Sequence, residues 1–248
     1  MRVTHNLRAD TITINGYNDD EIEAYLAVPT DVESVGSMII IHHMPGYDEG
    51  TKEIARKFAA NGYAALIPNL YYRAAPGASP DDAAATQRSL GGVPDDQLVG
   101  DAKGAMNYLK SLPISNGKVG VIGYCSGGRQ SFLVGLRLPV NAVIDCYGAF
   151  VAVDPPSEYG LKMTSLIGEV DQLQAPLLGL FGAEDKNPTP EQNQLLADAL
   201  TAAGKEFTFR TFEDAGHAFF MVDRVSFRPE AAIEGWKDIF TFLERTLA

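Results

Sequence analysis

Short, largely apolar runs alternate with helix-like stretches along most of this chain, and this alternation limits the folds it can adopt. The runs occupy residues 37–43, 63–70, 118–124, 142–148 and 175–182. Such runs, with little polar alternation, are typical of strands covered on both faces. Helical patterns fall between them, so the strands require crossover connections. The pattern predicts an α/β protein with a mostly parallel central sheet and helices on both faces.

The remaining segments extend this expectation. Residues 11–15 and 21–29 alternate polar and apolar side chains around a turn, which predicts antiparallel strands before the parallel part. A further strand is expected at 207–214. Residues 71–95 and 149–174 have weak periodicity and are expected to be irregular. No linker divides the 248 residues, so one domain over 1–248 is expected. Helices are expected at 51–61, with Thr51 as candidate N-cap, and at 96–112, 126–137, 189–203 and 229–247.

Charge and cysteine content narrow the function classes. The net charge is −12, and an acidic surface repels both nucleic acid and anionic membranes. Two cysteines do not make a disulfide framework, and no apolar run approaches the length of a membrane span. The first residues contain no apolar segment of a secretory signal. We therefore expect a cytoplasmic protein with a small-molecule partner, acting as a monomer or small homo-oligomer.

One strand–helix junction has the composition of a nucleophile-bearing turn. Cys125 directly follows the apolar run 118–124 and has Gly123 and Gly127 two residues away on either side. A nucleophile on a sharp turn needs such small neighbours. The N-terminus of the following helix favours a thiolate, and the Ser126 amide could stabilise an oxyanion. Cys125 is therefore the expected nucleophile, and Ser126 is the local alternative.

An acid and a histidine follow two later strands. Asp185 comes after the run 175–182, and His217 follows residues 207–214. The carboxyl ends of parallel strands meet at one edge of the sheet, and the order nucleophile, acid, histidine is that of α/β-hydrolase triads. Glu184 is the alternative acid, one residue out of register. The second cysteine, Cys146, lies within a predicted strand and is expected to fill the core.

Four segments together resemble the dienelactone hydrolase (carboxymethylenebutenolidase) family of α/β-hydrolases. They are NGYAALIPNLYYRAAPG (61–77), NGKVGVIGYCSGGR (116–129), LLGLFGAEDKNPTP (177–190) and FEDAGHAFF (212–220). The resemblance covers nearly the full length and implies the α/β-hydrolase fold. It also implies a Cys125–His217–Asp185 triad that hydrolyses an activated ester or enol lactone through a thioester. No metal or organic cofactor is implied.

The chain departs from the family pattern beside this triad. The position of the family glutamate that contacts the resting cysteine falls on His43, and the second oxyanion amide falls on Met44. The family arginine that holds a substrate carboxylate shortly after the catalytic histidine has no counterpart there. Arg224, Arg228 and Arg88 are the candidates to replace it. The substrate pocket is expected to include His43, Tyr72, Arg73, Arg88 and Phe219.

Three functions fit this reading. The leading one is hydrolysis of small activated esters or enol lactones. A broad-specificity carboxylesterase without lactone preference is the first alternative. A non-catalytic binding protein on the same fold is the second, and the complete set of triad residues argues against it.

Overall fold

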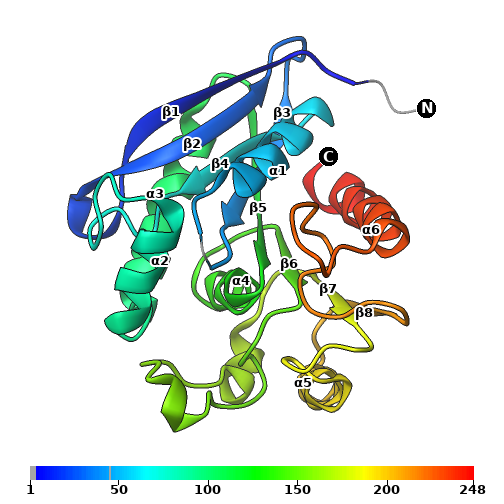
Figure 1. The fold of residues 1–248 in the computed structure, drawn as a ribbon. Helices are drawn as coiled ribbons and strands as arrows, with labels where there is room; N and C mark the ends of the chain where they lie inside the picture. Colours follow the sequence, from blue (N-terminus) through cyan, green and yellow to red (C-terminus); the bar gives the residue numbers. More distant parts are fainter. Residues whose placement is uncertain (1–3, 45) are drawn as a thin grey trace.

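The computed structural model describes residues 4–44 and 46–248, and within them eight strands form one sheet. The spatial order of the strands is β1-β2-β4-β3-β5-β6-β7-β8 (Figure 1). The pairings of β1 with β2 and of β2 with β4 are antiparallel, and all others are parallel. The strands are β1 (Leu7–Asn15), β2 (Glu21–Pro29), β3 (Val35–Ile41), β4 (Ala64–Pro68), β5 (Ser115–Tyr124), β6 (Ala142–Cys146), β7 (Leu177–Gly182) and β8 (Phe207–Phe212).

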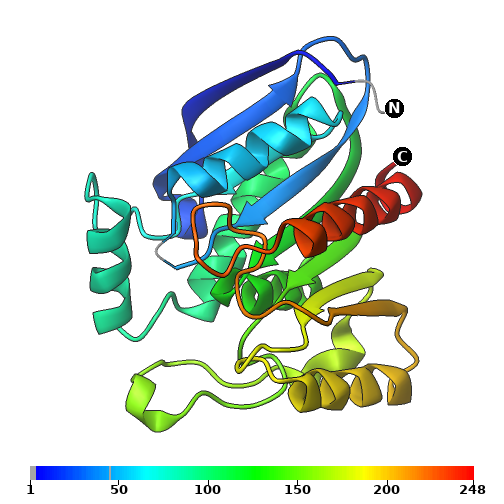
Figure 2. The ribbon, with the colours of Figure 1, turned by 45° about the vertical axis from the view of Figure 1, so that its right-hand side comes forward.

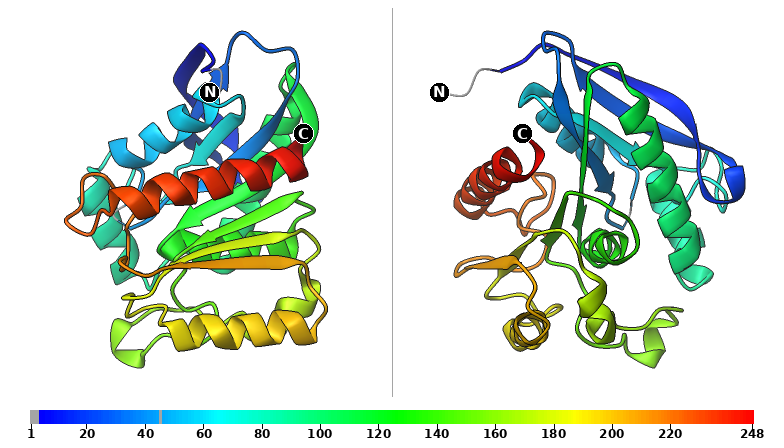
Figure 3. Two further views of the ribbon diagram at one scale, coloured as in Figure 1. Left: turned by 90° about the vertical axis from the view of Figure 1, so that its right-hand side faces the viewer. Right: turned by 180° about the vertical axis from the view of Figure 1, so that it is seen from behind.

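Helices cover both faces of this sheet, and a hydrophobic cluster fills each interface. Helices α1 and α6 pack on one face, and α3, α4 and α5 contribute to the cluster on the other. Figure 3 shows α6 and α1 together across one face of the sheet. Strand residues alternate between the clusters: Met38 and Ile40 face α1 and α6, whereas Ile39 and Ile41 face the opposite side. The helices are α1 (Glu49–Ala60), α2 (Pro80–Ser89), α3 (Asp95–Ser111), α4 (Ser126–Arg137), α5 (Pro190–Ala202) and α6 (Pro229–Leu247).

The predicted fold class is confirmed: the sheet is mostly parallel, its N-terminal strands are antiparallel, and helices flank it. Two local predictions were wrong. Residues 71–95 were expected to be irregular, but they contain α2, which begins after Ser79, the residue that caps it. Helix α1 is capped by Asp48, whose carboxylate accepts the Thr51 amide, rather than by Thr51 itself. None of the helices in the described residues has the length and apolar character of a membrane span.

Two segments outside the sheet project from the same side of the molecule. Helix α2 and the irregular stretch 149–174 both lie toward the left in Figures 1 and 2. The amide of Lys162 donates to the carbonyl of Gly91, just after α2, at 2.8 Å. This hydrogen bond joins the two segments, and residues from both line the cavity described below.

Candidate active site

The turn after β5 holds Cys125 in a conformation that few side chains adopt. Its φ is 58° and its ψ is −122°, at the N-terminus of α4. A Cβ at Gly123 would lie 1.7 Å from the carbonyl oxygen of Gly127, and one at Gly127 would lie 2.4 Å from the carbonyl oxygen of Ile41. Neither position can hold a larger residue without moving backbone. The two glycines therefore let the strand and helix approach closely enough to form this turn.

A histidine and a carboxylate meet beside this turn. His217 Nδ1 is 2.9 Å from Oδ2 of Asp185, whose side chain is buried. The other carboxylate oxygen of Asp185 accepts the amide of Asn187 at 2.9 Å. Burial lowers the pKa of His217, but hydrogen bonds to Asp185 and Cys125 outweigh it and raise this pKa to about 10. The structure thus brings Cys125, His217 and Asp185 together, and the raised pKa of His217 favours the protonated imidazole beside the sulfur and the carboxylate.

The three side chains line one cavity of about 810 Å³. Ser126 and Met44, the two residues expected to supply oxyanion amides, also line it, as does Arg88 on α2. Glu184 lines the cavity too, but it is exposed, and Asp185 is the residue that accepts the hydrogen bond from His217 Nδ1. The cysteines are both free, and Cys146 is buried in the core as expected.

Four residues predicted for the pocket do not line this cavity. Arg73 instead pairs with Asp20 and Asp101, at 2.8 and 2.9 Å, and ties the turn before β2 to α3. Phe219 is fully buried and packs against the ring of Tyr147, so it lies in the core. Tyr72 is half-buried and packs against the cluster on the α3 face. The fourth is His43.

His43 points toward α1 instead of the pocket. Its Nε2 lies 2.8 Å from Oδ2 of Asp48, and both side chains are largely buried. The other oxygen of Asp48 accepts the amide and hydroxyl of Thr51, each at 2.8 Å. Burial raises the pKa of Asp48, but the hydrogen bond and charge of His43, together with Thr51, bring this pKa below its usual range. His43 thus forms part of a polar cluster at the start of α1.

Tyr71 was a further candidate for the pocket entrance, with plain packing after the strand as the alternative. It lines the cavity and is buried shortly after β4, and its ring contacts that of His42 edge-on at 4.6 Å between centroids. Several other cavity residues were not predicted, and many of them belong to the irregular stretch 149–174, where no periodicity marks a residue as facing inward. The one available indication was the apolar residues within that polar stretch, namely Phe150, Tyr159, Leu161 and Met163.

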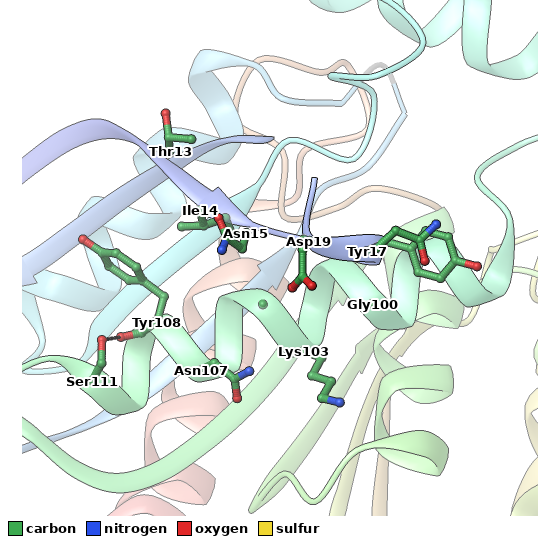
Figure 4. A pocket seen from close by; sticks show the side chains of 13 residues that line it. Thr13, Ile14, Asn15, Tyr17, Asp19, Gly100, Lys103, Asn107, Tyr108 and Ser111 are labelled. Carbon is green, nitrogen blue, oxygen red and sulfur yellow. Dashed lines mark hydrogen bonds between the residues drawn. The ribbon is translucent and has the colours of Figure 1, made fainter. Parts of the chain in front are cut away.

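A second cavity of about 740 Å³ lies between the β1–β2 turn and α3 (Figure 4). Polar side chains such as Asn15, Lys103 and Asn107 line it, and it contains no cysteine or histidine. It therefore lacks the reactive groups of the first cavity. In the described part of the chain, no group of three or more His, Cys, Asp or Glu side chains could hold a metal ion.

Comparisons with known proteins identify the family of the chain. The profile of the dienelactone hydrolase family matches residues 22–247. A protein of Methylorubrum extorquens, provisionally named carboxymethylenebutenolidase, is 30% identical over 222 residues, covering 88% of this chain and 75% of the relative. The carboxymethylenebutenolidase of Pseudomonas putida is 27% identical over 213 residues, covering 84% of each chain.

Solved structures share the fold. The crystal structure of a provisionally named dienelactone hydrolase from Klebsiella pneumoniae has a TM-score of 0.86 and 24% sequence identity, with 96% of this chain and 99% of that chain covered. The family profile spans β2 through α6 and thus includes every strand end that carries a reactive residue. The chain belongs to the dienelactone hydrolase family.

Proposed function

We propose that this chain hydrolyses small activated esters and enol lactones with Cys125 as nucleophile, His217 as proton carrier and Asp185 as the residue that orients His217. The contact of His217 with both Cys125 and Asp185 at the rim of one cavity is the observation that carries this proposal. Membership of the family makes the chain a carboxylic ester hydrolase. The triad and its thioester intermediate are our extension of that result.

In the first half of the reaction, the Cys125 thiolate attacks the substrate carbonyl carbon and forms a C–S bond. The amides of Ser126 and Met44 stabilise the resulting oxyanion. The C–O bond then breaks, and the His217 imidazolium gives its proton to the departing oxygen. The product is an alcohol or enol and an acyl group bound to sulfur as a thioester. In a lactone, both remain parts of one molecule.

In the second half, the now neutral His217 takes a proton from a water molecule, and the oxygen attacks the thioester. The C–S bond breaks, the acid is released, and the thiolate–imidazolium pair is restored. Asp185 accepts the Nδ1 proton of His217 in a hydrogen bond throughout and keeps Nε2 directed toward the reacting groups.

The chemistry of the nucleophile favours stable leaving groups. A thiolate is a better leaving group than an alkoxide, so an alkyl ester would mostly return to the starting thiolate. Enol lactones and aryl esters are therefore the proposed substrates, in preference to alkyl esters and amides.

Arg88 is the proposed contact for an anionic substrate group. Arg88 and Met44 both line the cavity, the guanidinium lies 2.8 Å from the Met44 sulfur, and no carboxylate of the described residues forms an ion pair with it. The other candidates are occupied: Arg228 donates to the carbonyls of Asp214, Val225 and Phe227, and Arg224 lies near Asp223.

Hydrolysis of p-nitrophenyl acetate tests the nucleophile. Cys125→Ala should abolish turnover, whereas the matched control Cys146→Ala should retain it because Cys146 is buried in the core. Retained turnover in Cys125→Ala would disprove the proposed mechanism. Iodoacetamide labelling adds a second measurement: His217→Ala should slow alkylation of Cys125 at neutral pH, since it removes the imidazolium beside the sulfur.

A carboxylesterase without lactone preference is the second candidate. The observation that favours it is the absence of an arginine directly after His217, where the sequence continues with Ala218, Phe219 and Phe220. Comparing kcat/KM for a dienelactone with that for aryl acetates separates the two. A much higher value for the dienelactone supports lactone hydrolysis, and a higher value for the acetates supports the carboxylesterase.

A further inference from the structure

The irregular stretch 149–174 gives the cavity an apolar wall that the proposed chemistry does not require. Phe150, Tyr159, Leu161 and Met163 all line the cavity from this stretch. Val93, between α2 and α3, lies among the same lining residues. Bond cleavage needs the sulfur, the imidazole and the oxyanion amides, so these apolar side chains must serve something else.

This wall is held in place by hydrogen bonds at several points. The amide of Lys162 donates to Gly91 at 2.8 Å, and the amide of Leu166 donates to Val151 at 2.8 Å. The buried guanidinium of Arg129 donates to the carbonyl of Thr164 at 2.8 Å. The first bond joins the stretch to the residues just after α2, the second joins two parts of the stretch, and the third joins the stretch to α4. The apolar side chains are therefore presented on a fixed surface that a substrate can use for recognition.

Two aromatic residues of the wall have features that favour ligand contact. Phe150 has a φ of 64°, in a region that non-glycine residues seldom occupy, and its ring meets that of Tyr159 edge-on at 6.0 Å. Tyr159 is 53% exposed although its ring borders the cavity. A substrate group that covered these rings would remove apolar surface from water.

The size of the cavity agrees with such a group. At about 810 Å³ it falls in the range of cavities that enclose drug-sized molecules, far more than an acetyl ester fills. Charged residues also line the cavity, namely Arg88 and the exposed Glu158, Glu184 and Lys186. Phe150, Tyr159, Leu161 and Met163 are the part of the lining suited to an uncharged aromatic group.

From the proposed hydrolysis at Cys125, we infer that this wall is an aromatic subsite and that the preferred substrates are esters with a bulky aryl group in addition to the reacting carbonyl. The subsite concerns which ester is selected and not how the bond is broken. Phe150, Tyr159, Leu161 and Met163 are its specificity-determining residues.

Two substrate pairs test the subsite. One pair enlarges the acyl side, comparing p-nitrophenyl 4-phenylbutyrate with p-nitrophenyl acetate. The other enlarges the alcohol side, comparing 4-phenylphenyl acetate with phenyl acetate. In at least one pair, the wild-type kcat/KM should be about tenfold higher for the larger ester. That pair also identifies which side of the substrate occupies the subsite.

Tyr159→Ala should then lower this preference about tenfold, seen mainly in KM, while Tyr108→Ala, which alters a tyrosine of the other cavity, should leave it at the wild-type value. Tyr159 is mostly exposed, so its replacement does not disturb the core. Absence of a preference in both pairs, or an equal loss in the two variants, overturns the subsite. These results are separable from the proposed hydrolysis, which stands or falls with the activity of Cys125→Ala.

Discussion

At the scale of single residues, His42 shows how burial determines the charge of a side chain. It is 1% exposed, its Nδ1 donates to the His43 carbonyl at 3.0 Å, and its Nε2 accepts the Leu70 amide at 3.3 Å. Because an amide can only donate, Nε2 carries no proton and the ring is neutral. Burial lowers the pKa of His42 to about 4.

This depressed pKa predicts a specific loss of stability in acid. Below pH 6.5 the unfolded chain protonates His42 while the folded chain does not, until the pH approaches 4. The stability that the neutral, buried His42 contributes is therefore complete above pH 6.5. As the pH falls from there toward the folded-state pKa, the free energy of unfolding decreases by about 1.4 kcal/mol per pH unit. Urea unfolding of the wild type and of His42→Gln at pH 7 and pH 5 measures this loss of stability. The variant should be less pH-dependent, and equal pH dependence would contradict the assignment.

The side-chain types of the candidate triad could be predicted from the sequence, but the directions of His42 and His43 could not. The run 37–43 reads as one strand, in which His43 would face the pocket and His42 the other side. The strand ends at Ile41, so strand alternation does not extend to either histidine. The end of β3 depends on its pairing with β4 and β5, and the direction of His43 depends on its partner Asp48. A local sequence pattern reveals neither.

At the scale of elements, the turn between β5 and α4 depends on backbone approaching backbone. The position of Gly123 is limited by the carbonyl of Gly127, and that of Gly127 by the carbonyl of Ile41 on β3. The sequence pattern at 123–127 predicts this turn because only small residues permit it.

Replacing one glycine of the turn should therefore destabilise the protein. Gly123→Ala puts a methyl group 1.7 Å from a backbone oxygen, and we expect a loss of about 3 kcal/mol or more in the free energy of unfolding. Gly168→Ala is the matched control, since no atom lies within 4 Å of its added Cβ, and it should change stability by less than about 0.5 kcal/mol. Chemical denaturation compares them. Equal effects would show that the turn tolerates a side chain.

Helix α2 is an element that the hydrophobic pattern of the sequence did not predict. Its inward face carries Ala83, Ala84 and Gln87, so the apolar stripe that identifies a helix is weak. The signals that were present, Ser79 as N-cap and Pro80 in the first turn, indicate where a helix begins without establishing that one exists.

At the scale of the whole molecule, the alternation of strands and helices predicts a mostly parallel sheet, but it does not predict the packing of irregular segments. Hydrogen bonds to backbone carbonyls, one of them from a buried cation, help to hold the stretch 149–174. No pattern in the sequence predicts such contacts. Arg129 is that cation. Its guanidinium donates to both carboxylate oxygens of Asp95 at 2.9 and 3.0 Å, and to the carbonyl of Thr164. It therefore joins α4, α3 and the apolar wall.

The two partners of this ion pair should differ in their effect on stability. Arg129 is 1% exposed, so Asp95→Ala leaves a buried charge without its counterion, and we expect a loss of about 3 kcal/mol. The Asp95 side chain is 38% exposed, so after Arg129→Met water can solvate the carboxylate, and a smaller loss of about 1–2 kcal/mol is expected.

Asp96→Ala controls for the loss of a negative charge in the first turn of α3, because Asp96 occupies the same turn and is exposed. It should cost less than about 1 kcal/mol. Urea unfolding at pH 7 ranks the three variants, and a larger loss in Arg129→Met than in Asp95→Ala would contradict the argument. Because Arg129 also holds Thr164, Arg129→Met should in addition weaken the preference for bulky aryl esters, whereas Asp96→Ala should not.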